Sequence, residues 1–198
     1  MALSKIQAES MNLADTYAFS GTVSGTPSDM KLLLNETISS SIGQYDISST
    51  YINSTYDTYY LDASFRPESD SKLLYMKPFV GGVISDSGLA YANFNIDTGQ
   101  RVFSDSTTNI RCAYNAVGNA NGESISLNGY LQNINSTTIP WCFSGMSNYY
   151  MTNGYHGSNC VTGGYVVANR ALVVNGLRLL FSGSNIQEGT VKLYGLRK

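Results

Sequence analysis

Aromatic rings and amide side chains gather in one stretch of this chain, between Trp141 and Tyr155. The apolar face of a sugar stacks on a flat ring. An Asn side chain offers both a donor and an acceptor to the hydroxyl groups of the sugar. Tyrosine also suits contacts with another protein, because it gives a large contact area at low entropic cost. Our candidate ligand or partner contacts are Asn148, Tyr149, Tyr150, Asn153, Tyr155 and His156.

Two other rings of this stretch are expected inside the protein. Trp141 and Phe143 are two residues apart, which is the spacing of side chains on one face of a strand, so we expect both in the core. For Tyr149, Tyr150 and Tyr155 a second interpretation stays open, in which the rings pack a long loop or a subunit contact.

Nucleophilic and metal chemistry would have to use His156, the single histidine, with Cys112, Cys142 or Cys160. A Cys160–His156 or Cys142–His156 pair would have the residue types of a nucleophile and its base. A zinc site is also conceivable, but the thiols have none of the close spacing of zinc motifs. We favour a surface-loop histidine and reduced, buried thiols.

The acidic residues carry the remaining candidates. Glu123 and Asp105 could form the carboxylate pair that glycoside hydrolysis requires, although sequence alone cannot pair them. Asp86, Asp97 and Asp105 fall in expected turns that could hold calcium, and we leave the binding of calcium open. We otherwise predict a protein that is not an enzyme and has no cofactor, no catalytic residue and no metal site.

Composition narrows the class of partner. Charged residues make up 13% of the 198 residues, the net charge is −2, and there are 15 tyrosines. Because no excess of basic residues is available to neutralise phosphates, we predict no nucleic-acid binding. Residues 1–18 hold Lys5, Glu9 and Asp15 and no long apolar run, so we predict no signal peptide and no membrane insertion.

Short strands with frequent turn signals are expected along most of the chain. In residues 124–131, Ile125, Leu127, Gly129 and Leu131 alternate with polar residues, as in a strand with one buried face. The pattern predicts an all-β, antiparallel sandwich or barrel, and residues 4–14 are either a helix or an extended arm. We expect strands at residues 31–37, 44–52, 57–66, 72–79, 88–95, 109–117, 123–133, 140–145, 161–167, 177–182 and 190–196.

Several phrases of the sequence resemble one family. The last residues, NGLRLLFSGSNIQEGTVKLYGLRK, are similar to the closing hairpin of jelly-roll domains in tail-fibre proteins of tailed bacteriophages. Residues 52–70, the strand 72–76 with Gly81–Gly82 and Tyr91, and residues 174–178 resemble further phrases of these domains, in the same order. The resemblance implies a jelly-roll β-sandwich over residues 31–198. It also implies a short N-terminal docking or oligomerisation arm at residues 1–30, which resembles segments that precede such domains.

The resemblance implies a function as well. We expect a non-enzymatic virion protein, made in the host cytoplasm, that serves as a tail-fibre or receptor-binding component and recognises a host surface glycan. Two alternatives stay open: a structural component (capsid decoration, collar or fibre-anchoring protein) that binds only other virion proteins, and a hydrolytic spike. The arm is expected to contact other virion proteins, and the family implies a homotrimer. Residues 109–162 match no phrase of the family, so specificity is expected there.

Overall fold

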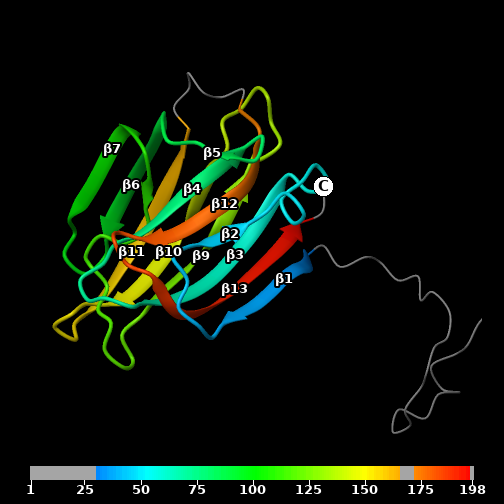
Figure 1. Ribbon diagram of the computed structural model, residues 1–198. Coiled ribbons are helices and arrows are strands. Elements are labelled where there is room, and N and C mark those ends of the chain that lie inside the picture. The colour runs from blue at the N-terminus through cyan, green and yellow to red at the C-terminus, as the bar shows by residue number, and fades with distance from the viewer. Residues whose placement is uncertain (1–29, 166–171, 197–198) are drawn as a thin grey trace, which may run out of the picture.

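The computed structural model describes residues 30–165 and 172–196, and these residues form two antiparallel sheets without a helix. The sheets lie face to face in Figure 1, so the expected all-β sandwich is confirmed. In spatial order, the larger sheet contains β1 (Met30–Ile38), β13 (Ile186–Leu196), β3 (Thr58–Pro67), β9 (Ile125–Gln132), β10 (Cys142–Tyr150), β11 (His156–Tyr165), β6 (Leu89–Asn95) and β7 (Arg101–Thr107). The smaller sheet contains β2 (Tyr45–Ile47), β12 (Val174–Phe181), β4 (Leu74–Val80) and β5 (Val83–Ile84), with β8 (Ile110–Arg111) also paired to β4.

The core follows directly from alternation within the strands. In β3, Tyr59, Leu61, Ala63 and Phe65 are all buried, while the residues between them face outward. A period of two is what a strand produces when one face packs against a second sheet. Trp141 and Phe143 are buried at 1% and 0% exposure, which confirms that both belong to the core.

Several expected boundaries need correction. The strand expected at 44–52 ends at Ile47, because a turn follows in which Tyr51 and Ile52 both donate to the Ser48 carbonyl. The strand expected at 109–117 is only Ile110–Arg111. The strands β5 and β7 were not expected. The segments 1–29, 166–171 and 197–198 lie outside the described residues, and the first of them is the whole of the expected arm except Met30, which begins β1.

The region between β10 and β11 differs most from expectation. β10 continues to Tyr150 and β11 begins at His156, so the expected long loop is a hairpin with a short connection. This change places the candidate residues of the sequence at the end of two paired strands. Successive side chains of a strand point to opposite faces of the sheet, so neighbouring rings in this stretch alternate between exposed and buried positions.

Residues 111–115, at the end of β8 and in the loop that follows it, pack against the inner face of β6, β10 and β11. The buried side chains of Asn93 and Asn159 form hydrogen bonds with the backbone of this segment. Asn93 Nδ2 donates to the Arg111 carbonyl at 2.9 Å, and Asn159 Oδ1 accepts from the Tyr114 amide at 3.4 Å. Asn159 Nδ2 also donates to Ser147 Oγ at 2.7 Å. Buried polar groups need such partners, which explains why amide residues occupy inward positions beneath an irregular segment.

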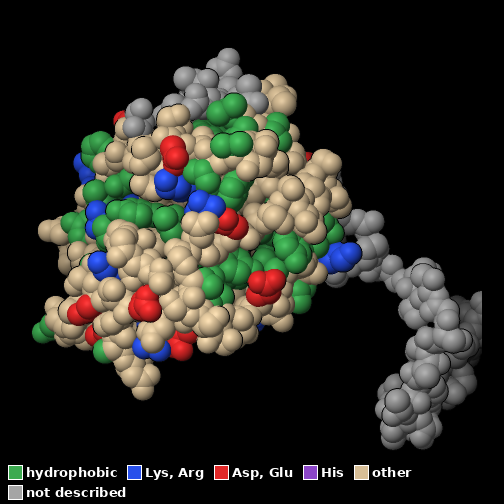
Figure 2. All heavy atoms as spheres, viewed as in Figure 1, with side chains coloured by type: hydrophobic (Ala, Val, Ile, Leu, Met, Phe, Trp, Pro, Cys, Tyr) green, Lys and Arg blue, Asp and Glu red, His purple; other side chains and the backbone are tan. Residues whose placement is uncertain are grey.

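The outer face of the smaller sheet carries paired charges, as the view in Figure 2 shows. Lys77 Nζ lies 2.6 Å from Asp86 Oδ1. Arg178 forms a bidentate ion pair with Asp46, in which Nε and Nη2 each donate to a carboxylate oxygen at 2.7 Å. The Arg178 guanidinium also lies over the ring of Phe79. This face is therefore locally balanced in charge, which contrasts with the outer face of the larger sheet described next.

Candidate functional site

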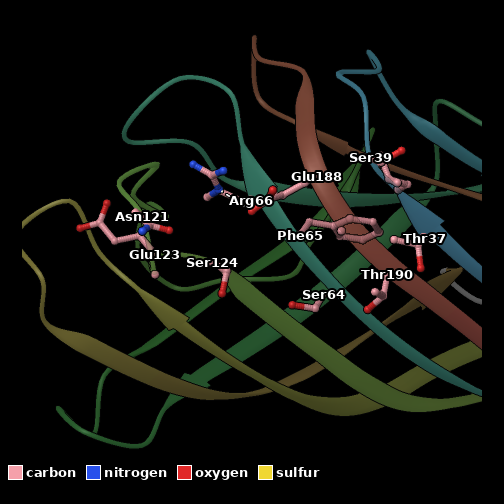
Figure 3. Close-up of a pocket in the computed structure, with 13 residues that line it drawn as sticks. Thr37, Ser39, Ser64, Phe65, Arg66, Asn121, Glu123, Ser124, Glu188 and Thr190 are labelled. Atoms are coloured by element: carbon pink, nitrogen blue, oxygen red, sulfur yellow. Dashed lines mark hydrogen bonds and ion pairs between the residues drawn. The ribbon is translucent and has the colours of Figure 1, made fainter.

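A hollow of about 590 Å³ opens where β1, β13 and β3 meet the turn before β9 (Figure 3). Its polar lining is rich in hydroxyl groups. The polar lining residues are Thr37, Ser39, Ser64, Arg66, Asn121, Glu123, Ser124, Glu188 and Thr190.

Strand register extends the hydroxyl groups of this hollow into a row across the sheet. Thr37 is opposite Thr190, Thr190 is opposite Ser64, and Ser64 is opposite Ser126. The row continues from Ser126 to Asn148 and then to Ser158. Side chains of directly paired residues lie on the same face of the sheet, and neighbouring strands are about 4.8 Å apart. Six strands therefore present one line of short polar side chains.

A second row runs beside the first, one step nearer the end of the sheet. Glu188 is opposite Arg66, and Tyr150 is opposite His156. Ser124 lies between the two pairs: it lines the hollow together with Arg66 and Glu188, and its carbonyl accepts from the Tyr150 amide at 3.0 Å. The rings of Tyr150 and His156 meet edge to face with centroids 5.4 Å apart. We call the two rows together the outer groove; the hollow is its part at β1, β13, β3 and the start of β9.

Arg66 is held firmly within the outer groove. Its Nε lies 2.9 Å from Glu188 Oε1, and its Nη1 donates to the Asn119 carbonyl at 3.1 Å. The turn that carries Asn119 is itself closed by Glu123, whose Oε2 accepts from the Ala120 amide at 2.8 Å. Gly118 leaves room for that carboxylate, since a Cβ atom there would lie 2.1 Å from Glu123 Oε2. Arg66 thus joins the sheet to the turn that borders the hollow.

Tyr149 does not contact solvent, which corrects the expectation that it touches a ligand. It points inward from β10 and is 1% exposed, and its hydroxyl accepts from the Asn115 amide at 3.0 Å. Burial raises the pKa of Tyr149. The physical reason is the alternation of β10, which sends Tyr149 inward and its neighbours Asn148 and Tyr150 outward.

The other five candidates lie on or beside the outer groove. Asn148 is part of the first row, where its Oδ1 accepts from Ser158 Oγ at 2.7 Å, and Tyr150 and His156 end the second row. Asn153 and Tyr155 lie in the connection between β10 and β11, where Asn153 Oδ1 accepts from the Tyr155 amide at 3.2 Å. Tyr155 is 69% exposed. Their role in binding stays a prediction.

Sequence reasoning missed the β1, β3 and β13 side of the outer groove. Thr37, Ser64 and Thr190 are remote in sequence and meet only through strand pairing. The available signal was their outward position within alternating strands, which marks a surface but does not say which strands are neighbours.

The candidate nucleophilic pairs are not assembled. His156 and Cys160 are four residues apart on β11, which is about 13 Å along a strand. Cys142 lies at the opposite end of β10 from Tyr150, the residue that faces His156. All three thiols are free. Only Cys112 is fully buried, whereas Cys160 is exposed, which corrects the expectation of three buried thiols.

The acidic candidates are also separated. Glu123 borders the hollow of Figure 3, whereas Asp105 lines a different one beside Trp141 and Phe143. Asp86 pairs with Lys77, and Asp97 accepts from the Ser158 amide at 2.8 Å. Within residues 30–165 and 172–196, no three His, Cys, Asp or Glu side chains are grouped so that they could hold a metal ion. Across the same residues, no helix has the length and apolar character needed to cross a membrane.

A scan against protein-family models and searches of curated proteins and of solved structures found no match to this chain.

Proposed function

We propose that this chain is a non-enzymatic bacteriophage virion protein, a tail-fibre or receptor-binding component that recognises a host surface glycan. The observation that carries the proposal is the outer groove, in which a line of hydroxyl and amide groups ends at exposed aromatic rings. A glycan offers many hydroxyl groups, each able to donate and accept, and Ser, Thr and Asn side chains match both roles.

The geometry of the outer groove suits an extended ligand. Its polar side chains project from six paired strands, so their spacing is fixed before a ligand arrives, which lowers the entropic cost of binding. At one end Tyr150, His156 and Tyr155 offer rings on which the apolar face of a sugar could stack. Asn153, in the same connection, adds an amide beside Tyr155.

The phage assignment rests on the sequence phrases and is supported by the nesting of strands. The first strands pair with the last, β1 with β13 and β2 with β12, while β3 and β4 lie on the other sides of β13 and β12. We include jelly-roll connectivity in the proposal, because this nested order is what two wrapped Greek keys produce. The non-enzymatic part is supported by the separation of Cys160 from His156 along β11.

A second candidate, a structural virion component, is favoured by one observation. On the same sheet face, beyond the first row and on its side away from Arg66, large apolar side chains are exposed, a pattern typical of a protein contact. They are Leu32, Phe94, Phe103, Tyr130 and Met146. Under the main proposal these residues contact the other subunits of a homotrimer or a neighbouring virion protein. Docking through residues 1–30 remains part of the same proposal.

A glycan array distinguishes the two candidates. The purified chain is expected to bind a set of surface glycans, and Tyr150→Ala is expected to lose that binding while the melting temperature stays unchanged. The matched control is Val83→Ala, which truncates a 69% exposed apolar side chain on β5, in the smaller sheet. No binding to any glycan, together with tight binding to phage particles that lack this chain, would reject the receptor-binding role in favour of the structural one.

A further inference from the structure

We infer that the outer groove selects glycans without acidic groups and rejects those that carry carboxylate, sulfate or phosphate groups. This inference rests on the proposed function and names the ligand class of the same groove. It is carried by the charges that line the hollow of Figure 3 and by the bonds that they already make.

An acidic sugar would need a cation in the hollow. Arg66 is the single Lys or Arg among the residues that line the hollow. Its Nε is paired with Glu188 at 2.9 Å and its Nη1 is bound to the Asn119 carbonyl at 3.1 Å. Only 19% of the Arg66 side chain is exposed, against 57% for Glu188, so a ligand meets the carboxylate more readily than the guanidinium.

Carboxylates outnumber cations among the residues that line the hollow. Glu123 and Glu188 both line the hollow, and in Figure 3 the Arg66 side chain lies between theirs. One guanidinium therefore faces two carboxylates. Glu123 cannot turn away without cost, because its Oε2 accepts from the Ala120 amide at 2.8 Å. Two further carboxylates lie outside the lining of the hollow but bond to nearby turns: Asp70 accepts from the Asn119 amide at 3.3 Å, and Glu68 accepts from Asn185 Nδ2 at 2.9 Å.

The consequence is a local excess of negative charge in a groove otherwise lined by hydroxyl groups. A neutral sugar keeps its hydroxyl partners and meets no repulsion. An acidic sugar must either displace Glu188 from Arg66 or lie beside two carboxylates that share one lining cation, and like charges at close range oppose binding. Glu188 is thus the specificity-determining residue, because it withholds Arg66 from anionic ligands.

The test uses the full chain on matched neutral and acidic oligosaccharides of equal length, with Glu188→Gln as the variant. We expect the wild type to bind the neutral series and to bind the acidic series at least about tenfold more weakly, a difference that one repulsive contact in a partly screened groove can produce. Glu188→Gln should raise the ratio of acidic to neutral affinity by about tenfold, since it frees Arg66.

The matched control is Asp86→Asn, which makes the same change in net charge on the opposite face of the sandwich, where Asp86 pairs with Lys77. It should leave the ratio unchanged; an equal rise in both variants would mean that net charge alone sets the preference and would overturn the inference. Wild-type preference for acidic glycans would overturn the inference alone. Binding to neither series would overturn the proposed function and the inference with it.

Discussion

The ring of Tyr149 occupies the space that a Cβ atom on Gly157 would need, because such an atom would lie 2.6 Å from Tyr149 Cζ. The two residues face each other across β10 and β11. The absence of a side chain at Gly157 lets the ring pack inside the sandwich, where its hydroxyl accepts from the Asn115 amide. This packing holds the end of the hairpin that carries Tyr150 and His156 on its outer side.

Gly157→Ala should therefore destabilise the fold. The added methyl group meets a ring that is enclosed on all sides, and overpacking of this kind costs about 1–3 kcal/mol in free energy of unfolding. Chemical denaturation measures the change. Gly43→Ala is the control, because its Cβ atom would meet only Asn185 Oδ1 at an ordinary 3.7 Å. Equal losses in both variants would contradict the role assigned to the Tyr149–Gly157 contact.

Tyr155→Ala should weaken glycan binding without loss of stability. Tyr155 is 69% exposed at the end of the outer groove, so its removal deletes a stacking surface and little core packing. We expect about a tenfold loss in affinity, in the range of an interface aromatic residue, and a change in stability of less than about 0.5 kcal/mol. Titration with a glycan that binds the wild type measures the loss. Unchanged affinity would remove Tyr155 from the site.

The three thiols should react at very different rates in the folded protein. Cys160 is exposed, whereas Cys112 is fully buried and its burial raises the pKa of the thiol, so little reactive thiolate forms. Burial also raises the pKa of Cys142, which is half-buried. Maleimide labelling followed by mass spectrometry should modify Cys160 first and Cys112 only after unfolding. Early labelling of Cys112 would contradict its place in the core.

Stability should fall as the solution becomes strongly alkaline. Burial raises the pKa of Tyr45, Tyr59 and Tyr149 above the value of about 10 in an unfolded chain. Below about pH 10 these hydroxyls keep their protons in both states and their contribution is complete. Above it the unfolded chain loses protons first, so the free energy of unfolding decreases with pH.

Denaturant titrations at pH 8 and pH 10.5 measure this decrease. Tyr45→Phe should show a smaller decrease than the wild type, because it removes one of the shifted groups, the one whose hydroxyl donates to Glu36 Oε2 at 2.6 Å. A stability that rises between the two pH values would contradict the assigned direction.

Sequence reasoning reached the sandwich because the alternation in strands such as β3 and β9 is local and strong. It failed where long-range pairing decides the outcome. Tyr149 points inward and Tyr150 outward because β10 continues past Gly145, and no residue type in that stretch predicts the continuation. Arg66 and Glu188 are 122 residues apart, so nothing local indicates that they share a hollow. Likewise, β2 ends at Ile47 because a turn closes there, whereas the apolar pattern of residues 44–52 alone predicts a longer strand.

We propose above that the outer groove is the surface that binds glycan. Ser64 lies in the middle of its first row, between Thr190 and Ser126, and faces outward from β3. The most direct test places a large ring there, as Ser64→Trp, and repeats the glycan array beside Tyr75→Trp, which places the same ring at an outward position of β4 in the smaller sheet. We predict that Ser64→Trp folds normally and loses the glycans bound by the wild type, while Tyr75→Trp keeps them. A folded Ser64→Trp variant that binds the same glycans as the wild type would contradict the account.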